Sequence, residues 1–278
     1  IFGYGYVSGI VSLTNLVSSS GVVATDVTGV GTARQGLAAA GYGTDKAIFG
    51  YGNSGSLSSL SNLVSSSGVV ASDVTGVGTA RNYVAAAGYG TDKAIFGYGE
   101  TDRDVSMTNL VSNSGVVATD TTGVGTARRE LAASGYGGDK AIFGYGINPA
   151  VSITNLVSNS GVVAADTTGV GTARADLAAA GYGGDKAIFG YGGSSVSLTN
   201  LVSNTGVVGS DVTGVGTARY ALAAASYGGD KAIFGYGYNG SNLSITNLVS
   251  SSGVVASDTT GVGTARRRLA AAGYSTSA

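Results

Sequence analysis

The pentapeptide Ile142-Phe143-Gly144-Tyr145-Gly146 decides how this chain folds, because it occurs six times. Each copy opens a unit of 45 to 47 residues, and the units follow one another without interruption over residues 1–47, 48–94, 95–141, 142–187, 188–232 and 233–278. A period in the forties is typical of propellers, solenoids and repeat arrays. We therefore expect a single repeat domain that spans residues 1–278.

Each unit contains four short apolar stretches between turn signals, which predicts four strands. Residues 151–157 alternate apolar and polar side chains, the period-two pattern of a strand. The Ala-rich stretch 177–182 is too short for a stable helix, so we expect a strand there as well. The other two strands are expected at 141–145 and 162–166. Six units of four antiparallel strands predict an all-β, six-bladed β-propeller.

The two ends of the chain fall at complementary points of the repeat. The chain begins on the second strand of a unit and ends on an innermost strand, residues 269–274. We expect this last strand to pair with residues 1–4, which closes the ring and removes two exposed edges. The chain has no initiating Met, so we expect a processed piece of a longer protein. A parallel solenoid is the rival architecture, but the two halves of a unit do not resemble one another.

Each unit also resembles a known repeat. Thr126-Ala127-Arg128 is followed by the small-residue stretch 131–135, by a Gly-Gly-Asp-Lys turn and by the pentapeptide. This order resembles the kelch repeat of galactose oxidase-like propellers over every unit. It departs where Tyr145 splits the paired glycines and where Val162-Val163 replaces an outer-strand Trp. The wording of the units is also similar to tandem repeats in environmental phage sequences.

Composition excludes several classes of function. The net charge of −1 offers no electrostatic reason to expect nucleic acid, and no apolar run approaches the ~20 residues that cross a bilayer. With neither His nor Cys, the chain cannot build imidazole triads, thiol nucleophiles or the usual zinc sites. We therefore expect no enzyme, no metal and no cofactor. A carboxylate-dependent glycoside hydrolase is a distant alternative, because carboxylates are present but nothing in the sequence pairs them.

The charged residues that recur in every unit have a structural explanation. Each unit keeps one Arg and one Asp, namely Arg34, Arg81, Arg128, Arg174, Arg219 and Arg266, and Asp26, Asp73, Asp120, Asp166, Asp211 and Asp258. In a propeller these Asp residues end the outermost strands and lie too far apart to share one ion. We expect Arg–Asp pairing or turn capping instead.

The residues that differ between units gather in two places, the loop after each pentapeptide and the pair after each recurrent Arg. Because antiparallel strands reverse direction at each turn, both segments are expected on the same face of the disc, the face that peptide-binding kelch propellers use for ligands. Tolerance of change in exposed loops would also explain such variation. Its enrichment in Tyr, Arg and carboxylates instead favours recognition. The expected ligand-binding residues are Tyr6, Gln35, Asn53, Asn82, Tyr83, Glu100, Asp102, Arg103, Arg129, Glu130, Asn148, Asp176, Tyr220, Tyr238, Asn239, Arg267 and Arg268.

The sequence thus predicts a non-catalytic scaffold, a monomeric disc with a constant core and one diversified face for a protein or glycan ligand. The alternative from another class is a purely structural module of a virion or surface protein. A virion-associated or extracellular location would suit either, although composition does not fix a compartment.

Overall fold

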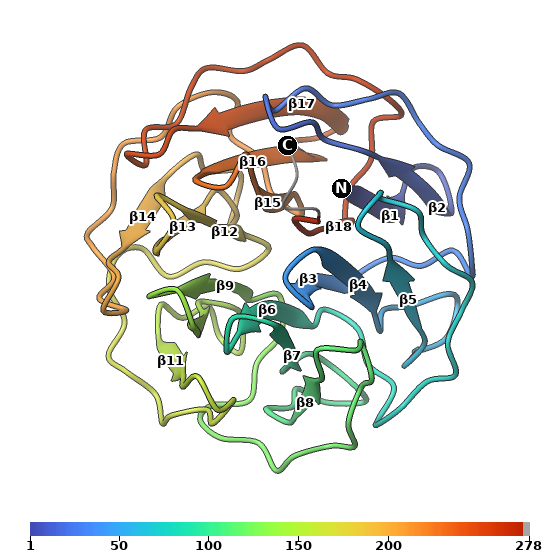
Figure 1. Cartoon of the computed structure of the whole chain (residues 1–278). Helices are drawn as coiled ribbons and strands as arrows, with labels where there is room; N and C mark the ends of the chain where they lie inside the picture. Colours follow the sequence, from blue (N-terminus) through green and yellow to red (C-terminus); the bar gives the residue numbers. More distant parts are fainter. Residues whose placement is uncertain (275–278) are drawn as a thin grey trace.

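The structure, a computed structural model, describes residues 1–274, which form eighteen strands and no helix. Figure 1 shows six three-stranded antiparallel sheets around a central axis. Written from the inner strand outward, they are β18 (Ala270–Ala271), β1 (Phe2–Tyr6) and β2 (Ile10–Asn15); β3 (Ala38–Tyr42), β4 (Lys46–Gly50) and β5 (Ser61–Val64); β6 (Ala85–Tyr89), β7 (Lys93–Gly97) and β8 (Thr108–Val111); β9 (Ala132–Tyr136), β10 (Lys140–Gly144) and β11 (Thr154–Val157); β12 (Ala178–Tyr182), β13 (Lys186–Gly190) and β14 (Thr199–Val202); and β15 (Ala223–Tyr227), β16 (Lys231–Tyr238) and β17 (Asn242–Val249). This arrangement is consistent with a six-bladed propeller.

The predicted fourth strand, residues 162–166 in one unit, is wrong as a regular strand. The outer segment touches β11 only through two isolated bridges, Val157 with Val163 and Thr154 with Thr167. Between these bridges β11 advances three residues and the outer segment advances four, so one extra residue interrupts the ladder as a β-bulge does. The side chain of Asn155 fills the interruption by donating from Nδ2 to Ala164 O at 3.0 Å.

The recurrent pentapeptide packs neighbouring sheets together. The ring of Phe143 lies 5.1 Å from that of Tyr98 in the preceding sheet. It also covers Gly97, where an added Cβ would come within 2.7 Å of the ring. The glycine is therefore required by close approach, and the same Phe, Tyr and Gly arrangement recurs around the axis.

The two ends of the chain meet in one sheet, as the repeat phase predicts. β18 pairs with β1 through Phe2 opposite Ala271 and Gly3 opposite Ala270. The amino group of Ile1 donates to Ala272 O at 2.8 Å. β18 also contacts the inner strands β15 and β3 on either side. The regular part of this strand is shorter than the expected 269–274.

Candidate recognition face

The two variable segments of each unit lie side by side, as the alternation of strand direction predicts. Isolated bridges join the residue after the recurrent Arg to the loop after the pentapeptide. These pairs are Gln35 with Asn53, Asn82 with Glu100, Arg129 with Ile147, Tyr220 with Tyr238, and Arg267 with Tyr6. In the remaining sheet, Gly193 N donates to Ala175 O at 2.7 Å. We call the surface formed by these two sets of segments the variable face.

The second residue of each variable pair forms a ring around the axis. All six residues have positive φ, between 51° and 62°, which turns their main chains toward one another. Five main-chain hydrogen bonds link neighbours around this ring: Gly36 N to Arg268 O (3.0 Å), Tyr83 N to Gly36 O (2.7 Å), Asp176 N to Glu130 O (2.9 Å), Ala221 N to Asp176 O (2.9 Å) and Arg268 N to Ala221 O (2.8 Å). Since only main-chain atoms make these links, the side chains at these positions are free to differ.

The ring encloses a small hollow in which two carboxylates meet an arginine. The hollow has a volume of about 70 Å³, and Glu130, Asp176 and Arg268 all line it. Burial raises the pKa of Glu130 to about 7, and the neighbouring charge of Asp176 adds to the rise. Burial also raises the pKa of Asp176, against the opposing charges of Arg268 and Arg129. The sequence does not predict this pairing, because the two residues come from different units.

An ion-paired cluster lies on the sheet of β6, β7 and β8 and its neighbour. Arg129 Nη1 lies 2.8 Å from Asp104 Oδ1 and 3.6 Å from Glu100 Oε1. The hydrogen bond from Asp104 raises the pKa of Arg129 further above its ordinary range. Asp104 is not among the expected binding residues, and its role depends on the distance between two sheets. Asp102 and Arg103 at the tip of the same loop are exposed.

An aromatic and cationic cluster lies on the sheets of β16 and β1. The rings of Tyr220 and Tyr238 meet edge to face at 5.5 Å. The guanidinium carbon of Arg267 lies 4.4 Å from the Tyr238 ring centroid and 5.1 Å from that of Tyr6. Arg268 lies over Tyr83 at 5.1 Å. Within residues 1–274 the only arginine of the variable face with an ion pair is Arg129, so Arg267 and Arg268 keep unpaired charges.

The remaining expected residues occupy the outer loops of this face. Asn53 Oδ1 accepts from Gly55 N at 2.8 Å and so shapes its own turn. Asn148 and Asn239 are exposed at loop tips, and Gln35 is partly buried. Sequence reasoning missed Asn242, whose Nδ2 donates to Val7 O at 3.0 Å while its Oδ1 is buried without a partner among the described residues.

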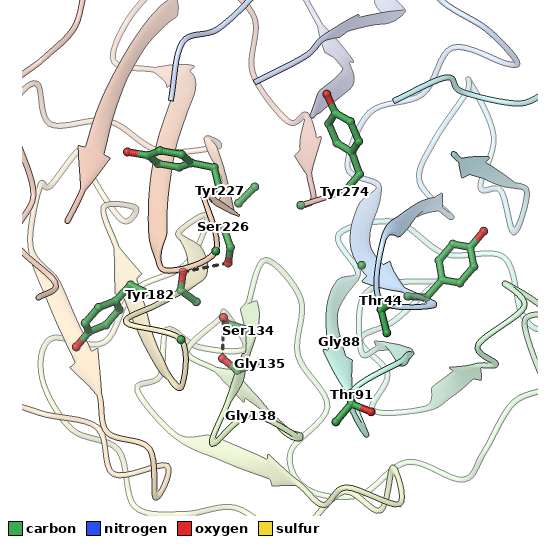
Figure 2. A pocket seen from close by; sticks show the side chains of 18 of the residues that line it. Thr44, Gly88, Thr91, Ser134, Gly135, Gly138, Tyr182, Ser226, Tyr227 and Tyr274 are labelled. Carbon is green, nitrogen blue, oxygen red and sulfur yellow. Dashed lines mark hydrogen bonds between the residues drawn. The ribbon is translucent and has the colours of Figure 1, made fainter. Parts of the chain in front are cut away.

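The opposite end of the axis is built differently. Figure 2 shows a cavity of about 590 Å³ whose tyrosines Tyr182, Tyr227 and Tyr274 point away from its centre. The recurrent Asp-Lys turns around it tie neighbouring sheets together with their side chains as well as their main chains. Asp92 O accepts from Gly43 N at 2.7 Å, and Asp92 Oδ2 accepts from Asn113 at 3.1 Å. This explains why these exposed turns hardly differ between units.

The recurrent Arg and Asp residues are structural, as expected. Arg128 is buried and donates to Tyr145 O and Asn155 Oδ1, both at 2.7 Å, while it lies over the Tyr98 ring of the preceding sheet at 4.5 Å. Asp166 caps a turn by accepting from Thr126 N and Oγ1. In four of the six units the equivalent Arg and Asp also form an ion pair of 3.5 to 3.9 Å.

The described residues contain no group of three acidic side chains placed to hold a metal ion. Nor does any helix in residues 1–274 have the length and apolarity needed to cross a membrane. In comparisons with known proteins, no family model matches this chain and no curated protein matches it.

Proposed function

We propose that the chain is a kelch-like, six-bladed propeller, closed by the pairing of β18 with β1, whose variable face binds a protein or a surface glycan without catalysis. The inner ring of the variable face is held by main-chain hydrogen bonds, which leaves its side chains free to diversify. The residues that stand there include the tyrosines and arginines that dominate the energetics of protein interfaces.

The observation that carries this proposal is the pair Arg267 and Arg268. Their charges have no ion-pair partner within residues 1–274, and their guanidinium groups lie against Tyr6, Tyr83 and Tyr238. A guanidinium held against aromatic rings keeps its N–H donors free in a fixed geometry, which lowers the entropic cost of binding a ligand. By contrast, every recurrent Arg is buried and consumed by framework hydrogen bonds.

Binding to a glycan array, a peptide-display library and candidate surface proteins tests the proposal. Tyr83→Ala and Arg267→Ala are expected to weaken binding of a selected ligand at least tenfold. Lys46→Ala, on the opposite face, is expected to leave that binding unchanged. Equal losses from all three variants would contradict the assignment of recognition to the variable face.

A structural module is the second candidate, and one observation favours it. Every unit exposes one valine by 65% at the outer edge, namely Val22, Val69, Val116, Val162, Val207 and Val254. Such a constant, exposed apolar position suits lateral packing in a larger assembly. A glycoside hydrolase is a distant third, because a hollow of about 70 Å³ is far smaller than the 300–1,000 Å³ typical of ligand pockets.

A further inference from the structure

The charges of the variable face are distributed unevenly around the disc. The inner strands contact one another in the order β18, β3, β6, β9, β12 and β15 (Figure 1), so the sheets of β15 and β18 lie across the axis from those of β6 and β9. On the first side the variable residues carry the two unpaired arginines, Arg267 and Arg268, and no carboxylate. On the second side four carboxylates face two arginines, and these residues are Glu100, Asp102, Asp104, Glu130, Arg103 and Arg129. The face is therefore positive along one edge and negative along the opposite edge.

A surface with this pattern is complementary to itself. A two-fold axis that lies in the face, along the line from the β3 sheet to the β12 sheet, turns the positive half of one copy onto the negative half of another. The sheet that holds Arg267 then lies over the sheet that holds Glu100 and Asp102. An interface of this kind is isologous, so each favourable contact occurs twice.

We propose that the variable face also binds a second copy of this chain, in a face-to-face dimer around this two-fold axis. Arg267 of each copy lies over the acidic loop Glu100–Asp104 of the other, where Asp102 is exposed. The Tyr220 and Tyr238 pair of each copy lies over Arg129 of the other, a contact of the kind that aromatic rings and guanidinium groups favour.

The residues that meet their own counterparts on the two-fold axis permit this contact. Along the β3 sheet these are Gln35 and Asn53, which are uncharged and able to hydrogen-bond with one another. Along the β12 sheet Asp176 stands in the axial hollow rather than at the rim. The sequence alone predicts a monomer, and it is the arrangement of charge across the disc that points to a dimer.

This inference goes beyond the proposed function, because a dimer of this form would cover the face that other ligands need. The two are tested separately, since self-association is measured on the pure protein with no ligand present. Sedimentation of the wild-type protein at increasing concentration is expected to show a rise in mass from 27.0 kDa toward twice that value. The rise is expected to weaken as salt shortens the Debye length from about 30 Å at 0.01 M to about 3 Å at 1 M.

Charge reversal identifies the contact. R267E/R268E and E100R/D102R are each expected to remain at the monomer mass, while an equimolar mixture of the two regains the doubled mass. K46E/K93E makes an equal change of charge on the opposite face and is expected to dimerise like the wild type. Circular dichroism checks that each variant is folded. A wild type that stays monomeric at all concentrations would overturn the proposal, as would a dimer that persists in both reversed variants.

Discussion

Three consecutive residues show how this chain separates framework from surface. Arg128 is buried and spends its side chain on two neighbouring sheets. Arg129 is partly exposed and pairs with Asp104, and Glu130 enters the axial ring through its main chain alone. A position held by its side chain cannot change without leaving buried groups unpaired, whereas a position held by its main chain can. The pattern of constancy and variation follows from this difference.

Replacing a recurrent arginine should therefore cost far more than replacing its neighbour. Arg128→Met leaves Tyr145 O and Asn155 Oδ1 without their donor. We expect the free energy of unfolding to fall by at least about 1–3 kcal/mol, the cost of a buried acceptor left unpaired. Denaturant unfolding measures this, with Arg129→Ala as the adjacent control, expected to change stability by less than about 1 kcal/mol. Similar losses in both variants would contradict the structural assignment.

The raised pKa of Glu130 predicts a dependence of stability on pH. The folded state holds this proton up to about pH 7, whereas the unfolded chain releases it near the ordinary value of 4.5. Because the folded state binds more protons in this window, the free energy of unfolding falls as the pH rises through it. Glu130→Gln carries no charge, so we expect it to be more stable than the wild type above pH 7 and similar below pH 4.5.

Thermal unfolding across this pH range measures the effect. Glu100→Gln, on the same face, keeps the buried Glu130 and is the control, expected to retain the wild-type dependence between pH 4.5 and 7. An unchanged pH dependence in Glu130→Gln would show that burial does not hold the proton on this carboxyl.

At the scale of the strand, sequence pattern predicts most of each sheet. The period-two alternation and the turn signals locate the three inner strands of each unit, although β11 begins at Thr154 and not at the expected Val151. The fourth strand could not be predicted, because the bulge opposite Asn155 depends on a side chain that replaces main-chain pairing. Such a substitution leaves no trace in the alternation of apolar and polar residues.

The middle strand of each sheet predicts a steric test. In Gly144→Ala the new Cβ would lie 2.7 Å from Phe189 Cζ of the next sheet, so the ring or the strand must shift. Overpacking of this kind costs about 1–3 kcal/mol of unfolding free energy. Gly9→Ala is the control, because its Cβ would meet nothing within 4 Å. Denaturant unfolding should separate the two variants, and equal stabilities would contradict the packing of Phe189 over Gly144.

At the scale of the whole molecule, the last residues of the chain complete the first sheet. Deletion of residues 265–278 removes β18 and also Arg266, which donates to Tyr4 O at 2.9 Å and lies over the Tyr236 ring at 4.4 Å. We expect the truncated chain to unfold at a much lower temperature than its lost length suggests, because β1 then exposes an unpaired edge. Thermal unfolding checks this, and a midpoint within a few degrees of the full chain would contradict closure by β18.

The sequence also predicts where the variable residues gather, but not how they meet. The reversal of antiparallel strands places Asn82 and Glu100 at the same end of neighbouring segments, and the bridge between them agrees. The contacts of Glu130 with Asp176 and of Arg129 with Asp104 join different units, so they depend on the spacing between sheets. That spacing is set by how Phe and Gly pack between sheets, which a linear pattern does not show.

Binding by a chain whose six variable pairs are made identical measures most directly whether the variable face recognises ligands. Each pair becomes Gln-Gly, as in Gln35 and Gly36, and Gly is compatible with the positive φ that every second position adopts. We expect this chain to keep the circular dichroism spectrum and unfolding temperature of the wild type but to lose the ligands that the wild type selects from the glycan array and the display library. Retention of those ligands with unchanged affinity would contradict recognition by the variable face.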